Sequence, residues 1–394
     1  MRSYLTATVS LLLLCTVSSG AEPPVDSTTA DALVTRTVLR QPGEDGVHTS
    51  RIPGLATTPA GTVVAVFDLR HQSAADLPQD IDVGMMRSTD DGETWSSVKP
   101  ILDFDKNEPG SLGNGVGDPA ILVDAQTNTL FVAAIWSKGD RGWKGSGPGV
   151  TPDETGQVVL TTSSDDGRTW SAPINTTPHI RGREPQWRLF FCGPGNGIQL
   201  KDGTLVFAAQ FREPAGPPHS CLLYSTDHGD TWTVSPPAIP DEPPTSEAQV
   251  AELDDGALLL TMRDESHSGE RVWARWTWNV RPDAETKGTQ PAGRWSQPWR
   301  TVADPTCMAS LIRHPSGALL FSNPNHPSER VALTVRTSSD EGRTWSAGQL
   351  LDPRDAMYSS MTVLRDGRIA ILYETAGTLT FARFPLEWIE QRGR

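Results

Sequence analysis

An eight-residue pattern, Ser-x-Asp-x-Gly-x-Thr-Trp, occurs four times in the chain and constrains the fold more than any other feature. Its copies occupy residues 88–95, 163–170, 225–232 and 338–345. Serine and aspartate side chains can bond nearby backbone groups and hold a tight turn, and glycine supplies a positive φ that other residues resist. The tryptophan can return into the core between neighbouring sheets. The pattern therefore predicts a chain built from repeated β units, in which the turns themselves are structural.

The spacing of the copies predicts the number of units. Successive copies begin 75, 62 and 113 residues apart. The last interval is about twice a repeat, which predicts one decayed copy, with Trp295 as its candidate remnant. A short turn followed by an apolar strand recurs six times, at residues 61–64, 128–131, 203–206, 256–259, 317–320 and 367–370. We therefore predict an all-β, six-bladed β-propeller, closed by pairing of residues 35–40 with the last blade, and a helical pattern only at residues 386–391.

The N-terminal residues are typical of an export signal. Arg2 precedes a short, mostly apolar run and then small residues at 18–21. These features predict a signal peptide over residues 1–21, a single propeller domain over residues 22–394, and export to the periplasm or the extracellular space. The run is too short to span a bilayer comfortably, so we expect no transmembrane segment in the mature chain. A lipoprotein anchor at Cys15 is the weaker alternative, because Leu14 is not the small residue that such a cleavage site needs.

The charge and the cysteines limit the partners. With a formal net charge of -14, the chain lacks the basic character of a nucleic-acid-binding protein. An anionic ligand would need positive charge concentrated in a pocket. Cys192, Cys221 and Cys307 follow the leader, and their odd number leaves at least one thiol free or intermolecular. A bridge between Cys192 and Cys221 and three buried thiols both remain open, and no cysteine–histidine spacing resembles a zinc site.

Motifs along most of the chain resemble those of the bacterial exo-α-sialidases (neuraminidases). They lie at residues 51–53, 68–77, 117–120, 246–250, 262–264, 330, 357–360 and 372–374, together with the four repeats, known in that family as Asp boxes. The resemblance covers about residues 45–385. It implies a propeller that releases terminal sialic acid from glycans, glycoproteins or glycolipids, with no metal or organic cofactor.

Three arginines, Arg51, Arg263 and Arg330, match the family's carboxylate clamp. Sialic acid bears a carboxylate on its anomeric carbon, and guanidinium groups bind carboxylates through planar, charge-assisted hydrogen bonds. Arginines from different blades can converge only near the propeller axis. By the same resemblance, Glu374 holds the first arginine in place and Arg70 is an additional arginine of the site.

Tyr358 and Glu247 match the family's nucleophile and its base. A carboxylate nucleophile would be repelled by the carboxylate of the substrate, whereas a neutral phenol is not, and sialidases depart from the two-carboxylate rule of glycosidases. Free tyrosine has a pKa near 10 and needs a base. We expect Glu247 to take its proton while the arginines favour the phenolate.

Asp76, six residues after Arg70 on a predicted loop, matches the general acid/base. Asp80 is the realistic alternative, and Asp82 falls in a predicted strand, where a structural role is expected. Asp118 matches a family residue that contacts substituents of the sugar ring, and an Asp-Pro turn competes with that interpretation.

These assignments predict a retaining, double-displacement hydrolase. A non-catalytic Asp-box propeller that binds glycans or proteins is the alternative from another class, but it has no need for Tyr358, Glu247 and Asp76 together. A trans-sialidase, or a hydrolase that prefers a deaminated sialic acid, also remains open.

Overall fold

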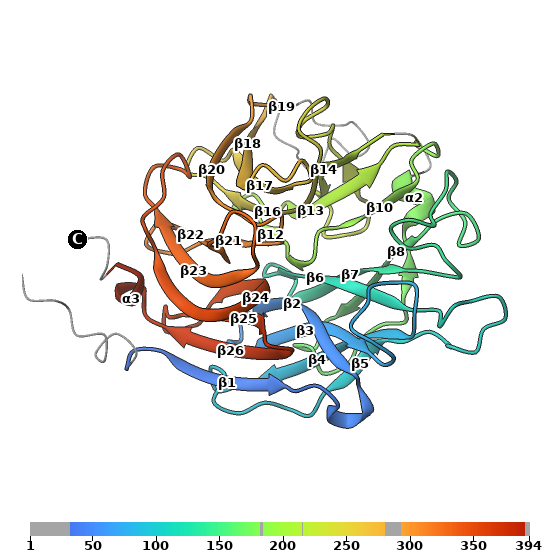
Figure 1. Cartoon of the computed structure of the whole chain (residues 1–394), viewed down its shortest axis with the longest axis horizontal. Coiled ribbons are helices and arrows are strands. Elements are labelled where there is room, and N and C mark those ends of the chain that lie inside the picture. Colours follow the sequence, from blue (N-terminus) through green and yellow to red (C-terminus); the bar gives the residue numbers. More distant parts are fainter. Residues whose placement is uncertain (1–31, 182–183, 215, 280–292, 391–394) are drawn as a thin grey trace, which may run out of the picture.

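The computed structural model describes residues 32–181, 184–214, 216–279 and 293–390, so the predicted signal peptide and Cys15 lie outside the described residues. Almost all of the regular structure is β-strand, and Figure 1 shows the strands as sheets arranged around a centre. The described residues also form three short helical elements: the 3-10 helix η1 (Glu44–Gly46), α2 (Thr177–Arg181) and α3 (Leu386–Glu390). Helix α3 confirms the helical pattern expected at the C-terminal end.

Four of the sheets contain four or five strands each. The first has the order β2 (Thr49–Thr57), β3 (Val63–Arg70), β4 (Ile81–Ser88), β5 (Lys99–Leu102). The second has the order β11 (Gly195–Asn196), β6 (Val116–Asp124), β7 (Thr129–Trp136), β8 (Gln157–Ser163), β9 (Ile174–Asn175). The third comprises β10 (Leu189–Cys192), β13 (Leu205–Arg212), β14 (Pro218–Ser225) and β15 (Thr233–Val234), with β12 (Ile198–Gln199) beside β13. The fourth comprises β16 (Thr245–Glu252), β17 (Leu258–Asp264), β18 (Glu270–Trp278) and β19 (Gly293–Trp295), with β20 (Trp299–Ala303) beside β18.

The last sheet joins the two ends of the described chain. Its order is β1 (Thr35–Arg40), β26 (Thr378–Phe384), β25 (Ile369–Thr375), β24 (Gln349–Val363), β23 (Val331–Ser338), β22 (Leu319–Pro324), β21 (Ser310–Arg313). The long strand β24 pairs with β23 through its first half and with β25 through its second half, so two meanders share it. The predicted pairing of residues 35–40 with the last strands is confirmed, with Thr35 opposite Arg383.

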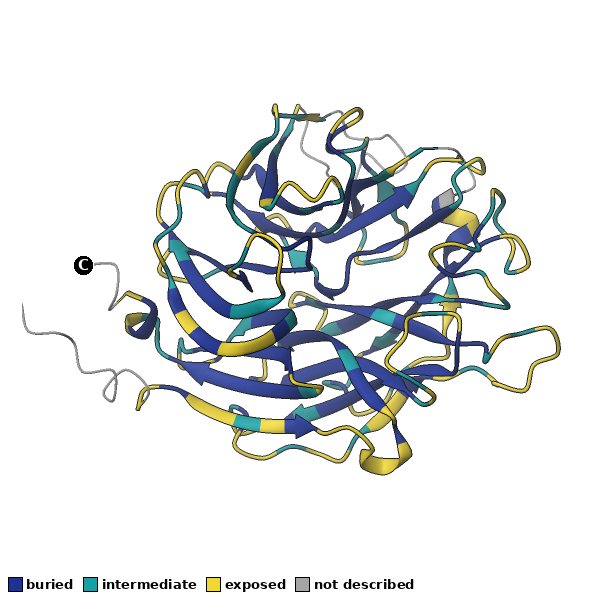
Figure 2. Ribbon diagram, viewed as in Figure 1, coloured by how far each residue is buried: buried dark blue, intermediate teal, exposed yellow. Residues whose placement is uncertain are grey.

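The inner strands of successive sheets contact one another in a cycle. Strand β2 lies against β6, β6 against β13, β13 against β16, β16 against β21, β21 against β24, and β24 against β2. This closed ring of antiparallel sheets is a β-propeller, as predicted. The number of six blades stays a prediction, since the two meanders that share β24 form one continuous sheet. Figure 2 shows the buried residues along the strands and the exposed ones mostly in the connecting loops.

The four Asp boxes fold into the same turn. In each box the serine hydroxyl accepts the glycine N–H at 2.8–3.0 Å, and the aspartate accepts both the backbone N–H and the hydroxyl of the threonine. The glycine has φ between 76° and 91°, and the residue before it also has a positive φ. The fixed residues thus supply the hydrogen bonds and the backbone conformation of the turn, as the pattern predicted.

The variable residue before each glycine ties the box to a neighbouring sheet. Asp166 accepts hydrogen bonds from Thr58 and Thr62 of the first sheet, and His228 bonds Asp124 of the second. The tryptophans act similarly: the ring of Trp95 packs edge-on against Phe381 of the last sheet at 5.1 Å between centroids. The boxes therefore fasten adjacent sheets as well as turning the chain.

Trp295 takes the place expected for the decayed box. In three of the intact boxes a serine follows the tryptophan and bonds the preceding strand, donating its N–H and accepting with its hydroxyl, as Ser96 does with Arg87 of β4. Ser296 makes the same two bonds with Arg275. The remnant therefore retains the anchoring end of the repeat.

Cys192, Cys221 and Cys307 are free and buried, so the open question of a bridge is answered in favour of three thiols. Cys192 and Cys221 flank Ala209 from opposite sides, which places strand β13 between them. Among the described residues, no helix has the length and apolar character needed to cross a membrane.

Candidate active site

Four inner strands break their register where predicted site residues stand. The irregularities lie between Arg51 and Gly54 in β2, between Gly117 and Ala120 in β6, between Thr245 and Ala248 in β16, and between Ala356 and Ser359 in β24. A β-bulge re-aims a side chain that strict alternation would send elsewhere, and bulges are frequent beside active sites. Tyr358, Glu247 and Asp118 all lie within these irregular segments, which explains how strands can direct them to one place.

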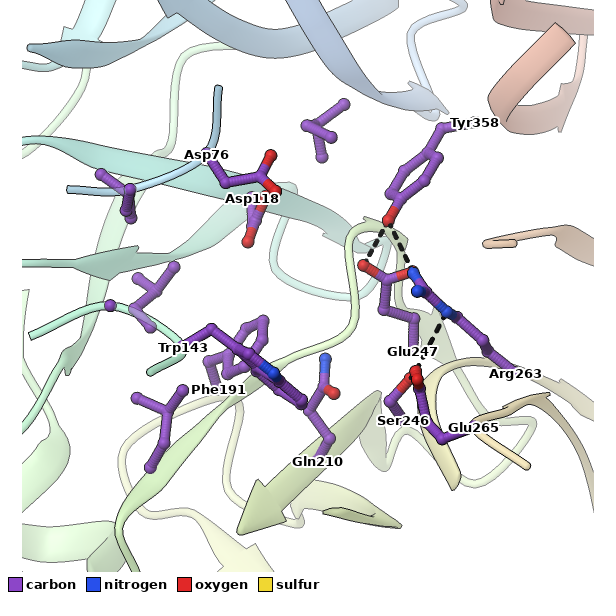
Figure 3. Close-up of a pocket in the computed structure, with 15 residues that line it drawn as sticks. Asp76, Asp118, Trp143, Phe191, Gln210, Ser246, Glu247, Arg263, Glu265 and Tyr358 are labelled. Atoms are coloured by element: carbon purple, nitrogen blue, oxygen red, sulfur yellow. Dashed lines mark hydrogen bonds and ion pairs between the residues drawn. The ribbon is translucent and has the colours of Figure 1, made fainter. Parts of the chain in front are cut away.

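Tyr358 and Glu247 meet directly. The Tyr358 hydroxyl donates to Glu247 Oε1 at 2.5 Å, and Arg263 Nη1 lies 3.0 Å from Glu247 Oε2 and 3.3 Å from the tyrosine oxygen. Figure 3 shows the three side chains pointing toward one another across one cavity. Phenol, base and guanidinium therefore form a single hydrogen-bonded group, as the sequence predicted for the first two.

The environment of Tyr358 keeps its hydroxyl protonated. Burial raises the pKa of Tyr358 well above its usual value and the Glu247 carboxylate adds to the rise, while Arg263 opposes both. Arg263 thus favours the phenolate, as expected, but burial outweighs the effect of this guanidinium group. The hydroxyl group is thus a hydrogen-bond donor to Glu247.

Arg51 lies over the ring of Tyr358. Its guanidinium carbon is 5.8 Å from the ring centroid, and its Nε donates to Glu374 Oε2 at 3.1 Å. The other Glu374 oxygen accepts the backbone N–H of Ile52 at 2.7 Å, so one buried carboxylate fixes both the side chain and its strand. Ile52 has a φ of 60°, a conformation that is unfavourable for a β-branched residue. Glu374 thus occupies the position expected for the residue that holds Arg51.

Arg70 is buried and fully engaged. Its Nε and Nη2 donate to Asp68 at 3.0 and 2.9 Å, and its Nη1 donates to the Ala74 carbonyl and to Asp76 Oδ1 at 2.7 and 2.8 Å. Burial raises the pKa of Asp68 to about 6, although Arg70 opposes the rise. Arg70 therefore ties the Asp76 loop to strand β3.

The structure separates the three aspartates considered for the general acid. Asp76 lines the cavity, its side chain is 76% exposed, and Oδ1 lies 3.6 Å from Arg51 Nη1. Asp80 is buried and faces Lys106 at 3.3 Å, and Asp82 bonds His71 at 2.8 Å. Neither Asp80 nor Asp82 lines the cavity. The geometry therefore favours Asp76, in agreement with the sequence.

Asp118 also lines the cavity, with a φ of 54°. Its backbone N–H donates to Asp68 Oδ1 at 2.9 Å. Enclosure by the protein, with the Asp68 carboxylate nearby, raises the pKa of Asp118 well above its usual value. A carboxyl group that is readily protonated can donate a hydrogen bond as well as accept one. Asp118 is therefore placed to contact a ligand, and it also forms part of an irregular strand.

Arg330 contacts the segment that includes Thr306 and Cys307. Its Nη2 donates to the Thr306 carbonyl at 3.0 Å. The next residue, Cys307, packs in a small cluster with Ile52 and Tyr358. The structure thus brings Arg51 and Arg263 to the tyrosine and places Arg330 beside the segment that packs behind it.

The cavity between these groups has a volume of about 180 Å³ and one apolar wall. Its lining includes three residues that the sequence did not single out: Trp143, Gln210 and Glu265. Trp143 lies in residues 139–152, whose many glycine and proline residues indicate a surface loop and give no sign of a role in the site. Gln210 is an interior strand residue without a distinguishing motif. Glu265 lies two residues after Arg263. Because successive side chains along a strand point to opposite faces, residues two apart share a face, and this spacing could have identified Glu265 from the sequence.

One group of potential metal ligands lies beside the site in the described part of the chain: His71, Asp80 and Asp82, with ligand atoms within 4.8 Å of one another. These groups already have partners, since His71 bonds Asp82 and Lys106 neutralises Asp80. These contacts join the residues at the stem of the loop that carries Asp76.

Comparison with known proteins gives this site its context. A family model described as a BNR repeat-like domain matches residues 71–371. A sialidase of Bacteroides fragilis is 40% identical over 354 residues, which cover 86% of this chain and 62% of the relative. A sialidase of Micromonospora viridifaciens is 33% identical over 391 residues, covering 95% of this chain and 56% of the relative. The chain thus spans about three fifths of the length of these curated relatives.

Solved structures agree with that result. The Hadza microbial sialidase Hz136 has a TM-score of 0.81 and 39% identity, over 90% of this chain and 69% of its own. The intramolecular trans-sialidase from Ruminococcus gnavus, at 18% identity and a TM-score of 0.73 over 90% of this chain and 98% of its own, shares the fold. The repeats and the ring of sheets define a BNR-repeat β-propeller. Within that class, the chain belongs to the sialidase family.

Proposed function

We propose that this chain is an exo-sialidase that hydrolyses terminal sialic acids from glycoconjugates with retention of configuration, using Tyr358 as nucleophile. The contact that carries the proposal is the 2.5 Å hydrogen bond from the Tyr358 hydroxyl to Glu247. A buried phenol beside a carboxylate that can accept its proton is the arrangement that an activated nucleophile requires. Relatives named as sialidases support the substrate class.

The cavity supplies the electrostatic reason for a tyrosine. Arg51 and Arg263 flank Tyr358, and a substrate carboxylate bound by them would lie next to the nucleophile. A carboxylate nucleophile in that place would repel the substrate, whereas a protonated phenol does not. We assign Arg330 to the same clamp from the family match, with the substrate carboxylate as the bridge between the three guanidinium groups.

In the first step, the Tyr358 oxygen attacks the anomeric carbon and passes its proton to Glu247. The bond from that carbon to the aglycone oxygen breaks as this oxygen takes a proton from Asp76. In the second step, Asp76 takes a proton from water, the hydroxide oxygen bonds to the anomeric carbon, and the tyrosine leaves and recovers its proton from Glu247. One water is consumed, two inversions give net retention, and all three side chains return to their starting states.

Time-resolved NMR of sialyllactose hydrolysis tests the proposal, with the Tyr358→Phe variant as the matched control. We expect the α-anomer of free sialic acid to appear first and to convert slowly to the β-anomer. First appearance of the β-anomer would overturn the retaining mechanism. Binding of sialyllactose without any product would instead favour the non-catalytic propeller.

Export remains part of the proposal, because residues 1–21 carry the features of a leader. Expression of the full chain and sequencing of the N-terminus of the exported protein tests it. An N-terminus at or near residue 22 is expected, and a retained leader would contradict the prediction.

A further inference from the structure

Glu265 immediately follows strand β17, and its carboxylate reaches the guanidinium group of Arg263. Glu265 Oε1 is 3.0 Å from Arg263 Nε, in an ion pair without the alignment of a directed hydrogen bond. Arg263 and Glu265 are two residues apart, so strand alternation places them on one face, and the Glu265 N–H extends the strand pairing by donating to the Pro244 carbonyl at 3.0 Å. Both side chains are about one fifth exposed.

Ser246 fixes the other end of this contact. Its hydroxyl donates to Glu265 Oε1 in a short hydrogen bond, and the serine itself is buried. Ser246 and Glu247 are adjacent residues in the irregular segment of β16. Ser246 bonds the carboxylate of Glu265, and Glu247 carries the other carboxylate that contacts Arg263. Figure 3 shows Glu247 and Glu265 on the two sides of the Arg263 guanidinium group.

The two carboxylates have different tasks in the proposed reaction. When Glu247 accepts the Tyr358 proton, its charge is lost and Arg263 is left without that anionic partner. Among the described residues, the Tyr358 hydroxyl donates to Glu247 and makes no hydrogen bond to Glu265, so Glu265 is not the group that receives the phenol proton. Burial acts to lower the pKa of Arg263, but Glu247, Tyr358 and Glu265 together outweigh it, which supports a guanidinium balanced by more than one neighbour.

We propose that Glu265, held by Ser246, is a positioning residue that keeps Arg263 oriented while Glu247 is protonated. The inference rests on the proposed function, since it needs Glu247 to act as the proton acceptor. Within the described part of the chain, Nη2 of Arg263 has no protein partner, so this arrangement leaves it free for a ligand carboxylate. Glu265 thus plays for Arg263 the part that Glu374 plays for Arg51.

The test compares Glu265→Gln with Glu93→Gln, a carboxylate that pairs with Arg383 away from the cavity. Because Glu265→Gln removes the charge of an ion-pair partner of Arg263 in a partly buried site, it should lower kcat on sialyllactose by about 10- to 100-fold. KM and the melting temperature should change little, since the contact matters most after proton transfer. Glu93→Gln should behave as the wild type. A kcat within twofold of the wild type for Glu265→Gln overturns the inference.

A double-mutant cycle separates positioning from a structural role. If Glu265 acts through Arg263, Glu265→Gln should cause less than about a twofold further loss in an Arg263→Ala background, and additive losses would overturn the inference. Ser246→Ala should reproduce part of the loss, and Ser246→Thr, which retains the hydroxyl, should restore it; this pair decides the matter if Glu265→Gln fails to fold. A wild-type protein without sialidase activity would overturn the proposed function and this inference together, whereas an active wild type with an unaffected Glu265→Gln would overturn the inference alone.

Discussion

Replacing Asp76 by alanine should remove the proton donor for the leaving oxygen and leave the fold intact. The Asp76 side chain is 76% exposed, and its partner Arg70 retains both bonds to Asp68 and one to the Ala74 carbonyl. General acid catalysis contributes about 10²- to 10⁴-fold, so the loss of kcat/KM on sialyllactose should fall in that range. An aryl sialoside has a leaving group that departs with little protonation, and its loss should stay below about tenfold.

Asp80→Ala is the matched control, because Asp80 lies four residues later on the same loop. Its carboxylate is buried and pairs with Lys106, which is 61% exposed, so the pair adds little to stability. We expect little change in melting temperature and similar, small losses of activity on both substrates. Steady-state kinetics of the two variants on the two substrates gives the comparison directly. If Asp80→Ala showed the dependence on the leaving group and Asp76→Ala did not, the assignment of the acid would be wrong.

Three further predictions concern the nucleophile, the clamp and the pH dependence of stability. Tyr358→Phe should lower kcat/KM on sialyllactose by about 10³-fold or more with little change in melting temperature, and near wild-type turnover would exclude it as nucleophile. Glu374→Gln should weaken binding of the unsaturated sialic acid analogue about tenfold in calorimetry, because Arg51 loses its charged partner; an unchanged Kd would contradict this. Burial raises the pKa of Asp82 to about 6, against the opposing hydrogen bond from His71. Its contribution to stability is therefore greatest below about pH 4 and falls as pH rises through about 6, so Asp82→Asn should flatten the melting temperature over this window, and equal slopes would refute the argument.

The repeat made the fold predictable because each of its positions has one physical purpose. Serine, aspartate and glycine close the same turn in all four boxes, and the tryptophans pack between sheets, so the pattern implied both the local geometry and the ring. The residue before each glycine could not be interpreted in this way. Asp166 and His228 are different residue types, but both form hydrogen bonds to a neighbouring sheet. A contact between distant segments cannot be predicted from an eight-residue pattern.

Motifs identified the predicted site residues. The structure adds how the strands bring these residues together and how far each side chain is buried. Register irregularities in β16 and β24 bring Glu247 and Tyr358 together, although the two residues are 111 positions apart in the chain. A shift of one residue in pairing depends on the partner strand, so the sequence of one strand does not reveal it. The protonated state of the tyrosine is equally invisible in sequence, because it depends on how far the folded protein excludes water. Trp143 reaches the cavity from a loop whose composition indicated only exposure.

The pairing of β1 with β26 has a consequence for how the molecule is made. Thr35 lies opposite Arg383, 348 residues later, so the first described strand to leave the ribosome bonds the last. During synthesis the edge of β1 has no partner, and the last sheet cannot be completed until β26 has emerged. A nascent chain shortened before residue 378 should therefore remain sensitive to proteases in its N-terminal strand, even where the earlier sheets have already formed.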